Sequence, residues 1–118
     1  VTLAALSLIF AGALSRVAGL VPMLWLSPAR VDGLGATVAA PSREAWGRAC
    51  LIAAAFGLAP WVAGAGLSQI VVAILAALGA AALVAKLAKR EIGGYTGDVL
   101  GAAQQFAEIA ILAALSAA

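Results

Sequence analysis

The chain of 118 residues has the length of one domain, but 65% of its residues are hydrophobic and only 10% are charged. Water-soluble domains carry about 25% charged residues, so a mean hydropathy of +1.13 indicates a membrane protein. The net charge of +2 rests on seven Lys and Arg residues, too few and too dispersed for a nucleic-acid-binding surface.

The missing residue types exclude several kinds of active site. The chain has no His, and Cys50 is its single cysteine. A disulfide, a zinc site of His and Cys ligands and an imidazole base are therefore excluded within this chain. The first apolar run is too long for a secretory signal and no basic segment precedes it. Because the chain begins with Val1 and not with methionine, we expect it to be part of a longer protein.

Four apolar runs predict an all-α fold, a polytopic transmembrane helical bundle. About 20 apolar helical residues cross a bilayer core about 30 Å thick, and the runs lack the alternation typical of barrel strands. The predicted helices cover approximately residues 3–26, 46–63, 67–85 and 99–118. A polar loop follows the first helix, the turn Gly64–Gly66 follows the second, and Gly93 and Gly94 open the last connection.

The basic residues predict how these helices are oriented. Six of the seven lie in or beside the first and last connections, namely Arg30, Arg43, Arg48, Lys86, Lys89 and Arg90. The positive-inside rule then places residues 27–48 and 86–98 in the cytoplasm and both chain ends on the other side. Topology alone accounts for the cluster around Lys86, although it could also attract a polyanionic substrate.

Arg16 interrupts the first apolar run. A charge at the centre of a bilayer costs about 2.5–3.5 kcal/mol on the mildest scale, so such residues usually face a bundle interior or an aqueous cavity. We expect Arg16 either to bind an anion inside a cavity, or else to extend its side chain toward the membrane surface or form a structural bridge with Glu108.

The fourth predicted helix carries a polar stripe. At 100° per residue its members fall within an arc of about 120°, and Glu108 lies about 15 Å beyond Asp98 along the axis. Such a stripe lines either a cavity or a helix contact held by hydrogen bonds. The stripe comprises Asp98, Gly101, Gln104, Gln105 and Glu108.

The connection Gly93–Asp98 could bind phosphate. Its three glycines let the backbone approach a ligand, and the helix that follows adds a positive dipole end. Asp98 could offer a carboxylate to Mg²⁺, which typically takes one or two protein carboxylates together with substrate phosphates. The alternative is that Thr96 or Asp98 caps the helix and the glycines only make a turn.

The residues from Arg90 to Ala102, followed by Gln104, Gln105 and Glu108, form a distinctive motif. It resembles the C-terminal signature of cobalamin synthases, also called adenosylcobinamide-GDP ribazoletransferases, in which an R-IGG-TGD-LGA loop precedes a helix with Gln and Glu. Ser15–Arg16 and Ala29–Gly35 are also similar to the family pattern, so the resemblance spans nearly the whole chain.

The resemblance implies an integral membrane enzyme of late cobalamin assembly, in the cell (inner) membrane of bacteria or archaea. It would join adenosylcobinamide-GDP to α-ribazole or its 5′-phosphate, release GMP and use Mg²⁺. The expected partners are these substrates and the lipid bilayer. No nucleic acid partner is expected, and the number of copies that assemble is left undecided between a monomer and a homo-oligomer. Asp98 and Arg16 would be catalytic, with Asp98 also a metal ligand and Asp32 a helper. Substrate-binding residues would be Arg90, Gly93, Gly94, Thr96, Gly97, Gln105 and Glu108.

The chain departs from the family in one respect. Members are about twice as long, and their N-terminal half carries an aspartate-rich DGLAD motif that Asp32–Gly35 does not reproduce. We therefore interpret residues 1–118 as the C-terminal half of such an enzyme, inactive alone.

Two other functions fit the residues. A small four-helix transporter or channel subunit would use Arg16 and Glu108 as an intramembrane charge pair. A structural helper would pack through small residues at Gly12, Gly57 and Gly79.

Overall fold

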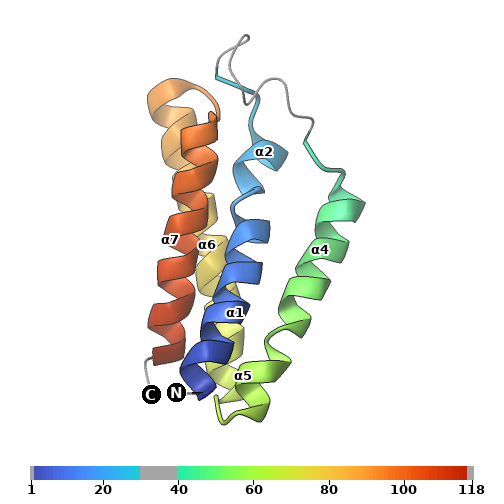
Figure 1. Cartoon of the computed structure of the whole chain (residues 1–118). Coiled ribbons are helices and arrows are strands. Elements are labelled where there is room, and N and C mark those ends of the chain that lie inside the picture. The colour runs from blue at the N-terminus through green and yellow to red at the C-terminus, as the bar shows by residue number, and fades with distance from the viewer. Residues whose placement is uncertain (1, 30–39, 117–118) are drawn as a thin grey trace.

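A computed structural model describes residues 2–29 and 40–116, which form a bundle of helices without strands (Figure 1). Four segments are long and apolar enough to cross a membrane: Thr2–Trp25, Arg43–Val62, Leu67–Ile92 and Gly97–Ser116. The predicted all-α transmembrane bundle is thus confirmed. Its elements are α1 (Thr2–Ala18), α2 (Val21–Trp25), α4 (Arg43–Ala55), α5 (Leu58–Val62), α6 (Leu67–Ile92) and α7 (Gly97–Ser116).

Prolines divide the first two spans, each of which the sequence predicted as one helix. Pro22 has no N–H group to donate to the carbonyl of Ala18, where α1 ends, and the chain resumes as α2. Pro60 likewise cannot donate to the carbonyl of Phe56, at the break between α4 and α5. Each break therefore lies one turn before a proline.

The end of the third predicted helix and the start of the second differ most from the predicted boundaries, and α7 begins at Gly97, two residues before the predicted 99. The last predicted residue of the third helix was 85, but α6 continues to Ile92 because the Lys, Leu, Ala, Arg and Glu residues that follow are good helix formers. It stops at Gly93, whose φ of 79° is the left-handed conformation of a helix C-cap. α4 starts at Arg43 instead of residue 46, since the Ser42 hydroxyl accepts a hydrogen bond from the Ala45 N–H at 3.1 Å.

The core lies where α6 and α7 pack against each other and against α1 (Figure 1). One face of α6 presents an alanine at every fourth position, and small side chains allow two helix backbones to approach closely in a membrane. The facing side of α7 contributes Ala103, Ala107 and Ile111, which are all fully buried. The buried alanines of α6 include Ala73, Ala77, Ala81 and Ala85.

The glycines predicted to mediate helix contacts differ in their surroundings. A Cβ on Gly57 would lie 3.1 Å from the Ile70 side chain and 3.3 Å from that of Phe10, so this glycine does sit at a tight contact. Gly79 has open space around it, and a Cβ on Gly12 would meet only the Arg16 side chain. The structural-helper interpretation is therefore supported at one of its three positions.

The two ends of the bundle differ in character. The start of α1, the end of α7 and the turn between α5 and α6 lie at one end (Figure 1). The end of α2, the start of α4 and the connection between α6 and α7 lie at the other. Arg43 and Arg48 near the start of α4 and Lys86, Lys89 and Arg90 near the end of α6 therefore lie toward this second end. The sequence predicted these cations on one side of the membrane, and that this side is the cytoplasm stays a prediction.

Candidate functional site

The two longer connections are joined by backbone hydrogen bonds. The Tyr95 N–H donates to the Ser27 carbonyl at 3.1 Å, and the Ala29 N–H donates to the Tyr95 carbonyl at 2.8 Å. Pro28 and Tyr95 form a short parallel bridge between them. We call this contact between residues 27–29 and 94–95 the loop junction. It brings residues 27–29 beside the Gly93–Asp98 connection.

The two glycines of the connection have separate structural roles. A Cβ on Gly94 would collide with the Ser27 carbonyl oxygen and lie 3.0 Å from the Ala29 nitrogen, so only glycine allows the junction to close. Gly93 supplies the positive φ that ends α6. The turn alternative is thus confirmed for both residues, and whether they also bind substrate stays a prediction.

The start of α7 combines a side-chain cap with open amides. The Thr96 hydroxyl accepts a hydrogen bond from the Val99 N–H at 3.2 Å, which confirms that Thr96 caps the helix. The N–H groups of Gly97 and Asp98 meet no acceptor among the described residues. Asp98 lies in the first turn with an exposed side chain. Free amides at a helix start favour an anion.

Arg90 lies at the end of α6, on the same end of the bundle. Its Nε lies 3.8 Å from Oε1 of Glu91, and both side chains are largely exposed. Such a surface pair contributes little stability. Arg90 therefore stays available to an anion that approaches the loop junction.

Arg16 does not occupy the interior of this bundle. Its side chain is exposed on α1, and Nη1 donates to the carbonyl of Gly12 at 2.9 Å. No ion pair joins Arg16 to Glu108. Among the described residues the one ion pair is that between Arg90 and Glu91. Ser15, one position earlier, takes the face of α1 that is buried in this bundle. Whether Arg16 lines a cavity stays a prediction.

The polar stripe of α7 lies at the edge of its contact with α1. A Cβ on Gly19 would be 3.0 Å from the Gln104 Cβ, so Gln104 packs against α1, and the helix-contact alternative holds at this position. Glu108 is half-buried and Gln105 is exposed. The fully buried face of α7 consists instead of the apolar residues given above.

Arg16 and Glu108 nevertheless lie at a similar depth in the bundle. α1 and α7 run antiparallel (Figure 1). From the Gly19–Gln104 contact, Arg16 is about 4.5 Å and Glu108 about 6 Å further from the loop junction, at 1.5 Å per residue. Polar groups thus reach the surface of the bundle within its apolar band, where lipid contact is costly. A polar neighbour is expected to cover them.

The described residues do not supply a complete metal site. They contain no group of three His, Cys, Asp or Glu side chains placed to hold a metal ion. Asp98 provides a single exposed carboxylate beside the loop junction. Arg30 and Asp32, named from the sequence, lie outside the described residues. A Mg²⁺ ion would therefore need further ligands beyond Asp98.

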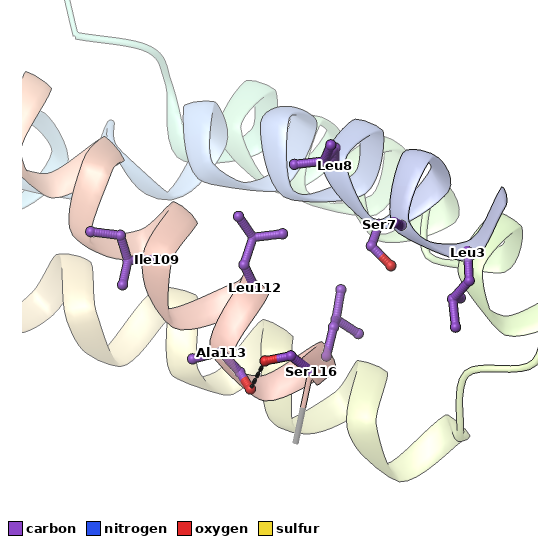
Figure 2. A pocket seen from close by; sticks show the side chains of 9 residues that line it. Leu3, Ser7, Leu8, Ile109, Leu112, Ala113 and Ser116 are labelled. Atoms are coloured by element: carbon purple, nitrogen blue, oxygen red, sulfur yellow. Dashed lines mark hydrogen bonds between the residues drawn. The ribbon is translucent and has the colours of Figure 1, made fainter. Parts of the chain in front are cut away.

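Two cavities lie along the faces of the bundle near its opposite ends. A cavity of about 800 Å³ opens between α1 and α7 near the chain termini and is lined mainly by apolar residues such as Leu3, Leu8, Ile109 and Leu112 (Figure 2). A smaller one of about 350 Å³ lies between α2 and α6, close to the loop junction, and includes Lys86 and Lys89. From the sequence, topology alone accounted for these lysines, with attraction of a polyanionic substrate as the alternative. Nothing in the sequence indicated that Trp25 would face them.

Fold and site together define a membrane-spanning helical bundle with a hydrogen-bonded pair of polar connections at one end. A family model described as Cobalamin-5-phosphate synthase matches residues 1–116. The chain belongs to this family, as the motif around Gly93–Asp98 indicated.

Curated relatives carry a matching name. The chain is 41% identical over 111 residues to an adenosylcobinamide-GDP ribazoletransferase of Azorhizobium caulinodans, covering 94% of this chain and 42% of that protein. A protein of the same name from Xanthobacter autotrophicus is 46% identical over 86 residues, covering 72% of this chain and 32% of its own length. One from a Sinorhizobium species is 38% identical over 122 residues, covering 96% and 44%.

The chain therefore spans less than half the length of these relatives. No solved structure matches it significantly.

Proposed function

We propose that this chain is part of a membrane-embedded transferase that joins adenosylcobinamide-GDP to α-ribazole or its 5′-phosphate and releases GMP. Membership of the cobalamin-5-phosphate synthase family supports the reaction class. The observation that carries the site assignment is the loop junction, in which Tyr95 bonds to Ser27 and Ala29. It gathers cationic, amide and carboxylate groups at one end of the bundle.

The groups beside the junction suit a diphosphate. Transfer of a phosphoryl-type group depends mainly on positioning and charge stabilisation, which backbone amides and cations supply without a covalent nucleophile. The free amides of Gly97 and Asp98 point from the start of α7, and Arg90 stands at the end of α6. These groups would bind and orient the phosphates of the GDP moiety. The glycines Gly93 and Gly94 would shape the backbone around them.

The Asp98 carboxylate supports a role for Mg²⁺. A carboxylate next to an anion-binding helix start repels phosphate unless a cation lies between them. When bound, Mg²⁺ would neutralise phosphate charge, and it accepts one or two protein carboxylates together with phosphate oxygens and water. Asp98 would be its ligand from this chain. The other protein ligands would come from parts of the polypeptide beyond the described residues.

The exposed polar groups within the apolar band support a substrate cavity at the side of the bundle. Arg16, Gln105 and Glu108 cannot all face lipid at low cost. We place the large amphipathic corrinoid or its acceptor against this surface, enclosed by the remainder of the full-length protein. Arg16 would then serve as the anion-binding cation of that cavity.

The charge distribution supports a cytoplasmic site. The loop junction lies at the end that carries the Lys86–Arg90 cluster, and the positive-inside rule assigns this end to the cytoplasm of a bacterial or archaeal cell membrane. Nucleotide substrates would reach it there. The transporter alternative lacks comparable support, because Arg16 and Glu108 form no ion pair in the described structure.

Two carboxylates at the same end of the bundle allow a matched test. In the purified full-length protein, Asp98→Asn should lower GMP release from adenosylcobinamide-GDP by at least about 100-fold, the size of effect typical for a lost group that stabilises transition-state charge. Glu91→Gln removes the same charge from an exposed side chain whose ion pair with Arg90 is a weak surface contact, and should leave turnover within about 2-fold. Equal, near-normal turnover in both variants would refute the site assignment.

A further inference from the structure

The cavity between α2 and α6 has a lining divided by chemistry. Its volume is about 350 Å³, within the range of about 300–1,000 Å³ found for ligand pockets. None of the residues proposed above to act on the substrates lines it. Its walls are formed by Trp25, Leu26, Ala82, Ala85, Lys86 and Lys89.

The two halves of this lining are separated along the helix axis. From Ala82 to Lys89, α6 advances about 10 Å toward the loop junction, at 1.5 Å per residue. The apolar alanines therefore lie on the side of the bilayer core, and both lysines lie toward the connections. Trp25, at the end of α2, is 61% exposed and forms the opposite wall.

The charge on the cationic half is uncompensated in the described structure. Lys86 and Lys89 are exposed and form no ion pair with any described residue, whereas the neighbouring Arg90 contacts Glu91. Two ammonium groups one helical turn apart attract an anion that can accept hydrogen bonds from both. A phosphate group has the charge and the oxygens for this, and an indole ring favours the boundary between apolar and polar regions.

We propose that this cavity binds a phosphate group attached to an apolar or aromatic body. Lys86 and Lys89 hold the phosphate, while Trp25, Ala82 and Ala85 contact the body. Two sources share this chemistry: the headgroup of an anionic phospholipid and the phosphate of a soluble substrate. The inference does not rest on the proposed transferase activity, because binding is measured without turnover.

The test uses the full-length protein in nanodiscs. In the first arm the lipid is phosphatidylcholine and inorganic pyrophosphate is titrated by calorimetry. In the second arm brominated phosphatidylglycerol, whose bromine atoms quench tryptophan fluorescence, is added to the nanodiscs. The quenching of Trp25 is obtained by subtracting the quenching measured in a Trp25→Phe variant from that of the unchanged protein. Each arm is repeated with the double variant Lys86→Gln/Lys89→Gln. Arg43→Gln/Arg48→Gln removes two exposed charges from α4 and serves as the control.

The loss of both lysines should weaken binding by about 30-fold, as expected for two cations near a membrane surface. Lysine-dependent pyrophosphate binding identifies the soluble source, and lysine-dependent quenching identifies the lipid. The control should change either signal by less than about 3-fold. Should the Gln variant fail to fold, Lys86→Ala and Lys89→Ala are tested singly. If neither signal falls further on loss of the lysines than in the control, the proposal is overturned.

Discussion

The backbone of Tyr95 is hydrogen-bonded to Ser27, a residue of a distant segment of the chain, with the Tyr95 nitrogen 3.1 Å from the Ser27 oxygen. Tyr95 is itself buried, with 4% of its surface exposed. The two polar connections are therefore one structural unit, and a substitution in either connection is expected to alter the conformation of both.

Removal of the Thr96 hydroxyl should destabilise the start of α7. Thr96→Ala leaves the Val99 N–H without its 3.2 Å acceptor, and the loss of such a cap costs about 1 kcal/mol. Thr96→Ser keeps the hydroxyl and should unfold like the unchanged protein. Unfolding of α7 in the detergent-purified protein, followed by hydrogen exchange of its first turn, checks this. Equal exchange in the Ala and Ser variants would contradict the cap.

A methyl group at Gly19 should disturb the contact of α1 with α7. Its Cβ would lie 3.0 Å from the Gln104 Cβ and 3.1 Å from the Ser15 carbonyl oxygen, and overpacking of this kind costs about 1–3 kcal/mol. Gly79→Ala is the matched control, because that Cβ meets open space and alanine favours a helix. Unfolding midpoints in denaturing detergent should fall for Gly19→Ala only. A fall of the same size in both variants would show that α1 and α7 are not in this contact.

Replacement of Trp46 should loosen α4. Its Nε1–H donates to the Val17 carbonyl at 2.9 Å, beside the break between α1 and α2. Trp46→Phe retains the ring but removes the donor, at a cost of about 0.5–1.5 kcal/mol. Trp61→Phe changes an exposed ring at the other end of the same span and should cost less. Protease cleavage of the connection before α4 measures the difference, and equal cleavage rates would argue against the hydrogen bond.

The sequence allowed the number of spans to be predicted because the length of each apolar run determines whether it can cross a membrane. Which end of the bundle faces the cytoplasm stays a prediction from the positions of the cations. The sequence did not reveal the breaks before Pro22 and Pro60, since a proline in a membrane helix is often accommodated without a new element. The end of α6 was placed too early because Lys86 and Lys89 were taken as a boundary. Charge does not end a helix, whereas the positive φ of Gly93 does.

The site was predicted in part. The motif from Arg90 to Ala102 identified the correct family. Thr96 was named, together with Asp98, as a candidate cap, and the structure shows that it is Thr96. The role of Gly94 could not be derived, because it depends on Ser27, a residue of a distant segment whose approach no local pattern indicates. The Arg16–Glu108 bridge failed for a related reason. Similar depth in the bilayer does not fix the direction in which two side chains point.

The central claim is that the loop junction organises the substrate site, and Gly94→Ala tests it most directly. A Cβ there collides with the Ser27 carbonyl oxygen, whereas a Cβ on Gly101, also at the junction end of α7, meets nothing within 4 Å. We predict that Gly94→Ala lowers GMP release by the full-length protein at least about 10-fold, since a displacement of about 1 Å is costly for positioned groups. Gly101→Ala should retain near-normal turnover. Normal turnover in Gly94→Ala, with the protein folded in the membrane, would contradict the account.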